Sequence, residues 1–101
     1  MQTGRVLKFF ITNATDDVDA GFLFRICSPY GDVQRVVVEA RFVEDFVEAW
    51  VEFEDEREAR NACDVLDGGS AGGCSLRVIV CNRTTLQVKT NNRLSYDFAK
   101  A

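Results

Sequence analysis

Hydrophobic and polar residues alternate most regularly in the segment from Phe46 to Glu54. A period of two is typical of a β-strand that buries one face and exposes the other. The first face carries Val47, Ala49, Val51 and Phe53, and the opposite face carries Phe46, Glu48, Trp50 and Glu52. The same period predicts a strand over 5–11, with one face formed by Leu7, Phe9 and Ile11. Residues 33–39 and 75–81 contain several β-branched side chains and are further predicted strands.

Two other segments show helical spacing. Apolar residues recur four positions apart between Val18 and Ser28, which predicts a helix there. Three aspartates precede it and are suited to cap the free amides at a helix start: Asp16, Asp17 and Asp19. Pro29 and Gly31 then end this helix. A second helix is predicted over 55–66, with a buried side formed by Ala59, Ala62, Cys63 and Leu66.

The predicted elements follow the order β-α-β-β-α-β, which is the α+β, ferredoxin-like arrangement. We expect one domain over 1–101, with a core at about 5–81 and an extension over 82–101. Residues 67–73 are rich in glycine and predict a turn, and 86–89 predict a short fifth strand. From Thr90 onward the chain is polar. This tail is either loosely held or docked on the body through Leu94, Tyr96 and Phe98.

Charge argues both for and against a nucleic-acid partner. The net charge is −4 and the isoelectric point is near 4.7, which disfavours phosphate as a ligand. The distribution is uneven, because Met1 to Leu76 contains 7 Lys and Arg against 15 Asp and Glu. From Arg77 to Ala101 there are 5 basic residues against one acidic residue. A locally basic C-terminal segment therefore follows an acidic body.

The residue types make catalysis and metal binding poor hypotheses. The chain has no histidine, and its four cysteines are irregularly spaced without a CxxC pair. No nucleophile-elbow or phosphate-loop motif occurs. We therefore expect no enzyme activity, no metal, no cofactor and four reduced thiols. No apolar run is long enough to span a membrane, and no signal peptide is expected.

The face of the sheet without helices is the candidate functional surface. The first and third strands are expected to be neighbours, so Phe10 and Trp50 are expected to stand outward side by side. Exposed rings of this kind are platforms on which nucleobases stack. Two alternatives remain open: the C-terminal segment covers the rings, or the strand phase is reversed.

Two motifs on these strands resemble those of RNA-recognition-motif domains. Residues 9–14 (FFITNA) look like the hexamer of that family, and 46–53 (FVEAWVEF) look like a degenerate octamer. The usual octamer begins with a basic residue, then glycine, then an aromatic. This chain has Phe46, Val47 and Glu48 there, so the ordinary two-ring stacking arrangement is altered.

A closer resemblance is to the polypyrimidine-tract-binding and heterogeneous nuclear ribonucleoprotein L family, especially to its second domain. Residues 26–36, 48–53 and 73–97 carry this resemblance. It implies a fifth strand and single-stranded RNA ligands that are rich in pyrimidines or in CA. It also implies one module of a longer protein in messenger RNA splicing, stability and localisation. The implied location is the nucleus, with shuttling to the cytoplasm.

The RNA hypothesis assigns roles to residues on the uncovered face and in the basic segment. Phe10 stacks a base, and Trp50 or Ile79 packs a neighbouring one. Polar and charged residues meet phosphates and base edges: Lys8, Arg35, Arg77, Lys89, Asn91, Asn92 and Arg93. Acidic residues in two loops depart from the family pattern and suggest weaker or more selective binding: Asp16, Asp17, Glu44 and Asp45.

The alternative is a degenerate domain that binds a peptide, because Glu48 and Glu52 on the sheet would repel phosphate. A basic or apolar peptide would then lie on the sheet or on the helical face near Phe22, Phe24 and Tyr30. The peptide hypothesis gains if Glu48 and Glu52 lie at the sheet centre with nothing basic beside them, and the RNA hypothesis gains if Arg77 and Lys89 flank the rings. In either case we expect a monomer.

Overall fold

The computed structural model describes residues 4–15, 17–39, 46–81 and 93–98. The elements in chain order are β1 (Val6–Thr12), α1 (Ala20–Cys27), η1 (Ser28–Tyr30), β2 (Val33–Glu39), β3 (Phe46–Phe53), α2 (Glu56–Leu66), β4 (Ser70–Ala71), β5 (Cys74–Cys81) and β6 (Arg93–Asp97). The predicted β-α-β-β-α-β order and an added C-terminal strand are therefore confirmed.

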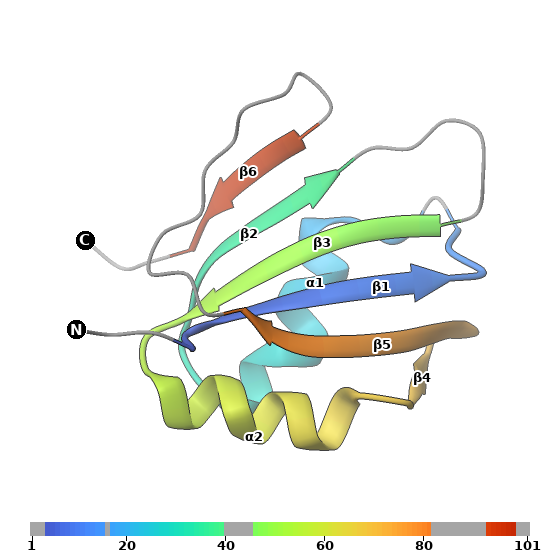
Figure 1. The fold of residues 1–101 in the computed structure, drawn as a ribbon. Helices are drawn as coiled ribbons and strands as arrows, with labels where there is room; N and C mark the ends of the chain where they lie inside the picture. The colour runs from blue at the N-terminus through green and yellow to red at the C-terminus, as the bar shows by residue number, and fades with distance from the viewer. Residues whose placement is uncertain (1–3, 16, 40–45, 82–92, 99–101) are drawn as a thin grey trace.

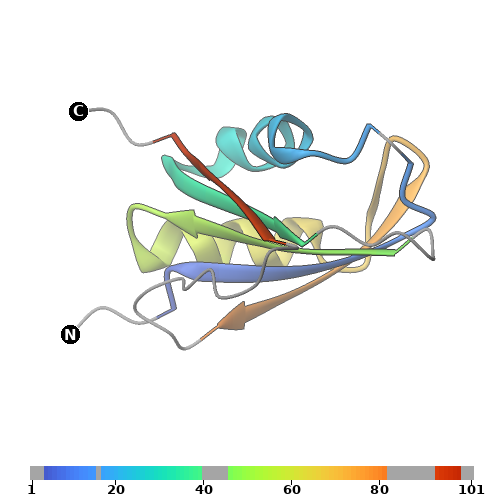
Figure 2. The same cartoon turned by 90° about the horizontal axis from the view of Figure 1, so that it is seen from above.

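The described strands form one antiparallel sheet in the order β4-β5-β1-β3-β2-β6. The first and third strands of the core are neighbours, as the functional argument required. Both helices lie on the same side of the sheet (Figure 1). In the view from above, α1 lies to one side of the strands, and no helix of the described residues lies on the opposite side of β1 and β3 (Figure 2).

Aspartate side chains fix the start of both helices. The Asp19 side chain accepts a hydrogen bond from the Phe22 amide at 2.9 Å, and that of Asp55 accepts one from the Glu58 amide at 3.0 Å. Each bond satisfies an amide that has no partner within its helix. The first helix therefore begins at Ala20, two residues after the predicted start at Val18.

The main core lies between the helices and the sheet, and the alternation in β1 and β3 predicted its composition. Leu7, Phe9 and Ile11 of β1 are fully buried. From β3, Ala49, Val51 and Phe53 join them. The helices contribute Phe22, Leu23, Cys27, Ala59 and Ala62. Burial of this apolar surface is the main favourable term in folding, at about 25 cal/mol per Å².

One segment differs from the sequence-based expectation, and one alternative left open by the sequence is decided. The glycine-rich turn contains the two-residue strand β4, which pairs with the start of β5. Of the two alternatives for the polar tail, docking is confirmed for residues 93–98, because β6 pairs with β2 over Arg35–Glu39. The amide of Phe98 donates to the carbonyl of Gln34 at 2.9 Å. The fifth strand predicted over 86–89 lies outside the described residues.

The structure holds all four cysteines as thiols. Among the described residues, no three histidine, cysteine or acidic side chains form a group that could hold a metal ion. Within those same residues, neither helix has the length and apolarity that a membrane crossing requires.

Candidate nucleic-acid interface

Phe10 lies in the middle of a cross-strand row on the uncovered face. Its Cα is paired with that of Glu48 on β3 and with that of Arg77 on β5. The Phe10 side chain is partly exposed, whereas its neighbour Phe9 points to the core and is fully buried. The predicted strand phase is therefore confirmed, and a ring on this face is accessible for stacking.

Phe46 lies beside Phe10 and is an aromatic residue that the sequence analysis did not assign to the site. The two ring centroids are 6.4 Å apart, with an angle of 26° between the ring planes. The alternation along β3 places Phe46 on the same outward face as Glu48 and Trp50. That alternation is the signal in the sequence that identifies Phe46 as a second ring of the surface.

Trp50 faces the same side but is not the exposed platform that was expected. Only 9% of it is accessible, because it packs with Val6 and Val37 in a small cluster separate from the main core. The expectation of an exposed Trp50 is therefore wrong. Ile79, which shares a cross-strand row with Lys8 and Trp50, is 47% exposed and offers the accessible apolar surface.

Lys8 connects the aromatic residues of this face to its acidic residues. The Nζ atom lies 4.8 Å from the Phe10 ring centroid and 5.1 Å from that of Trp50. It also lies 3.2 Å from Oε1 of Glu48. A cation above an aromatic ring is attracted to its negative face, so Lys8 is held above both rings.

Glu52 is likewise accompanied by basic side chains. Its carboxylate lies 3.4 Å from Arg5 and 3.9 Å from Arg35. Since Lys8 accompanies Glu48, both acidic residues at the sheet centre have cations beside them. The condition that would favour a peptide on the sheet, nothing basic beside these two carboxylates, is therefore not met.

Arg77 is directed toward the end of α2 rather than toward the rings. Its Nε atom lies 3.2 Å from Oδ1 of Asp67, and that same oxygen accepts the Val78 amide at 2.8 Å. The Val78 amide, together with the Arg77 guanidinium, holds the pKa of Asp67 below its ordinary value of 3.8. Because the side chain of Arg77 is 74% exposed, this surface ion pair is a weak restraint.

Of the remaining predicted contacts, Arg93 alone is among the described residues. The Cα of Arg93 is paired with that of Glu39 at the start of β6. Lys89, Asn91 and Asn92 lie outside the described residues. The structure therefore brings Lys8, Phe10, Trp50, Ile79 and Arg35 onto one face, and the backbone of Arg93 onto the edge of that face.

The sequence of residues 9–77 matches the model of the family described as RNA recognition motif. The chain belongs to the RNA recognition motif family. The match begins within β1 and ends within β5, so it includes residues 9–12 of β1, the whole of β3 and both helices. The sequence-based resemblance to this family is therefore confirmed.

Relatives of this RNA recognition motif domain include heterogeneous nuclear ribonucleoprotein L from Mus musculus and from Homo sapiens. Each is 34% identical over 95 residues, which cover 92% of this chain. That region is only 16% of each relative, so the chain spans about a sixth of their length. Two solved structures of the Mip6 RRM3 domain share the fold, with TM-scores of 0.70 and 0.66 at 15% identity. The aligned regions cover 79% of this chain, and 95% and 96% of the two Mip6 chains.

Proposed function

We propose that this RNA recognition motif domain binds single-stranded RNA on the uncovered face of its sheet and performs no catalysis. The observation that carries the proposal is the partly exposed Phe10, which stands at the sheet centre between the positions of Glu48 and Arg77. One base stacks on Phe10, at roughly 1–3 kcal/mol. A neighbouring base packs on Ile79, while the buried Trp50 supports the surface between them.

Charged side chains supply the second part of binding. Lys8 already lies above the Phe10 ring, and a phosphate near that ring competes with Glu48 for its ammonium group. Arg35 and Arg77 are exposed enough to turn toward a ligand, with 39% and 74% of their side chains accessible. In this proposal the RNA contacts are completed by Arg93 at the start of β6 and by three residues that precede it in the sequence: Lys89, Asn91 and Asn92.

The relatives support a cellular setting for this activity. Their name describes a nuclear ribonucleoprotein, and this chain matches a small part of them. We infer one module of a longer nuclear protein that shuttles to the cytoplasm and acts in messenger RNA processing and stability. The ligands are pyrimidine-rich or CA-rich strands. Because acidic side chains accompany the basic side chains of the sheet, the monomeric domain binds RNA weakly alone. Linkage to sister domains raises the overall affinity.

The test is an NMR titration of the domain with short CU-rich and CA-rich oligonucleotides at low salt. Amide shifts are expected in β1, β3 and β5 around Phe10 and Ile79, and at the β6 edge. An unchanged spectrum at high micromolar RNA would refute RNA binding by this domain in isolation. Shifts confined to the helices would refute the assigned face.

A further inference from the structure

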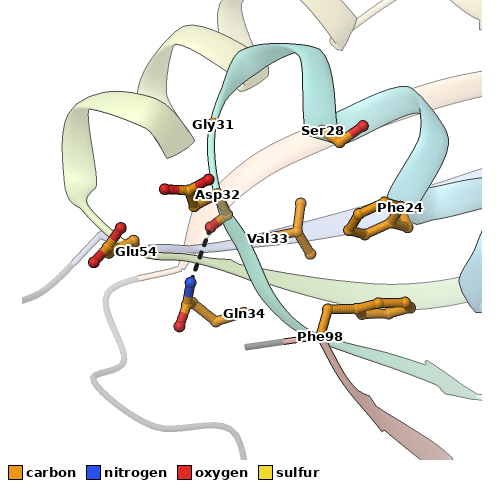
Figure 3. A pocket seen from close by; sticks show the side chains of 8 residues that line it. All are labelled: Phe24, Ser28, Gly31, Asp32, Val33, Gln34, Glu54 and Phe98. Atoms are coloured by element: carbon orange, nitrogen blue, oxygen red, sulfur yellow. Dashed lines mark hydrogen bonds between the residues drawn. The ribbon is translucent and has the colours of Figure 1, made fainter. Parts of the chain in front are cut away.

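A hollow of about 460 Å³ opens between the end of α1, the start of β2 and Phe98 (Figure 3). Its volume lies within the range of pockets that take small ligands or single side chains of a partner. None of the residues that line it is assigned to RNA binding. Figure 3 shows two unlike ends, with the rings of Phe24 and Phe98 at one and the carboxylates of Asp32 and Glu54 at the other.

The apolar end is preformed. The rings of Phe24 and Phe98 stack with centroids 4.6 Å apart and an angle of 24° between their planes. The backbone bond from the Phe98 amide to the Gln34 carbonyl holds one ring in place, and α1 holds the other. These stacked rings form a flat apolar wall of the hollow. Because they are already held in place, a ligand that packs on them costs little side-chain conformational entropy.

The acidic end gathers like charges. The amide of Glu54 donates to the carbonyl of Asp32 at 2.9 Å, which keeps the two residues adjacent. A hydrogen bond and repulsion from Asp32, with further repulsion from Glu58 and Asp55, raise the pKa of Glu54. Within the part of the chain that the structure describes, no ion pair joins Asp32 or Glu54 to a lysine or arginine.

We propose that this hollow binds a peptide segment of another protein in which an arginine adjoins an apolar residue. The guanidinium group lies between the carboxylates of Asp32 and Glu54, and the apolar side chain packs on Phe24 and Phe98. Arginine fits better than lysine, because its planar fork donates to two carboxylate oxygens at once and also stacks on aromatic rings. The negative charge of the acidic end excludes nucleic acid from this pocket.

The pocket and the RNA face are separate sites on one domain. Peptide binding here therefore leaves Phe10 and its neighbours available, and a partner protein can be recruited to an RNA-bound domain. The proposal specifies one site for the peptide hypothesis of the helical face. It is compatible with RNA binding by the sheet.

The test is an NMR titration of the 101-residue chain with a capped pentapeptide in which arginine is flanked by leucines. A matched peptide with citrulline in place of arginine keeps the shape and removes the charge. The arginine peptide is expected to shift amides over 28–34 and at Phe98, at concentrations up to about 1 mM. Glu54→Gln is expected to weaken binding about tenfold, the effect of losing one charge-assisted hydrogen bond.

Asp64→Asn is the matched control, because it removes one charge from an exposed position on α2 outside the pocket. It is expected to leave the affinity unchanged. Equal binding of the citrulline peptide, shifts confined to the sheet face, or no shifts at all would each overturn the proposal. So would an equal loss of affinity in Asp64→Asn, which would indicate attraction by net charge alone. The same pocket shifts with Mg²⁺ alone would assign the carboxylates to a cation instead.

Discussion

The ammonium group of Lys8 lies 3.2 Å from the carboxylate of Glu48 and 4.8 Å from the centre of the Phe10 ring. The proposed base platform is therefore bordered by a cation that is already engaged by an acid. A phosphate that approaches Phe10 must displace this carboxylate before it experiences the full attraction of Lys8. The acidic composition of the domain thus acts at a defined position rather than only as a diffuse net charge.

Replacement of Glu48 by glutamine is expected to strengthen RNA binding. The change removes one repulsive charge and releases Lys8 to contact a phosphate, so the slope of the salt dependence should steepen by about 0.7 for one new phosphate contact. Fluorescence anisotropy with a CA-rich oligonucleotide at several salt concentrations measures both effects. Asp64→Asn changes the net charge equally from α2 and should have a much smaller effect. Indistinguishable behaviour of the two variants would contradict a specific role for the Lys8–Glu48 pair.

Stacking and phosphate contacts are expected to separate experimentally. Phe10→Ala removes the base platform and should cost roughly 1–3 kcal/mol of binding free energy with the salt slope unchanged. Lys89→Ala or Arg93→Ala should weaken all sequences alike and reduce the slope by about 0.7. Circular dichroism must show an intact fold in each variant. A large decrease in the slope of the salt dependence for Phe10→Ala would argue against base stacking as the role of Phe10.

Trp50 is expected to contribute to stability more than to RNA contact. It packs with Val6 and Val37 and is only 9% exposed. Trp50→Ala should lower the free energy of unfolding by about 3–5 kcal/mol, while Trp50→Phe should cost less because it leaves a smaller cavity. Chemical denaturation measures this difference. Weak RNA binding by a fully stable Trp50→Phe variant would instead show that the indole itself contacts the ligand.

The direction of each side chain was predictable because strand geometry is local. Alternation placed Phe9 in the core and Phe10 on the uncovered face, and both assignments are confirmed. The burial of Trp50 was not predictable in the same way. It depends on Val6 and Val37, which are distant in sequence and become neighbours only through strand pairing.

The sequence predicted the docking of the C-terminal segment only in part. Tyr96 and Phe98 follow the period of two that marks a strand, but no local signal gives the register of β6 against β2. The stacking of Phe98 on Phe24 joins the end of the chain to its first helix. The ion pair of Arg35 with Glu52 follows from the register of β2 against β3, which spacing along the sequence does not give.

Asp67 is expected to make stability depend on acid pH. Its pKa is lowered in the folded state by the Val78 amide and by Arg77, so its contribution is present at neutral pH. That contribution is lost as the pH falls through the folded-state pKa, below the ordinary value of 3.8. Asp67→Asn should be less stable than the parent at neutral pH, and the two should converge in strong acid. An Asp67 carboxyl titration midpoint at or above 3.8 would contradict this account.

The cysteines are expected to differ sharply in reactivity. Burial raises the pKa of Cys27 to about 12, and only the thiolate is an efficient nucleophile. Cys27 is fully buried and Cys74 is 1% exposed, whereas Cys63 is partly exposed with a pKa that burial and two nearby aspartates raise. Iodoacetamide at about pH 8 should therefore modify Cys27 and Cys74 far more slowly than Cys63 in the folded protein.

Mass spectrometry of peptides after timed alkylation measures each site separately. Unfolding in denaturant removes the burial, so all four thiols should then react at similar rates. Fewer than four reactive groups after unfolding would contradict the reduced state that the structure holds. Rapid modification of Cys27 without denaturant would mean that α1 separates readily from the sheet. Protection of Cys27 thus reports directly on the packing that supports the proposed RNA-binding face.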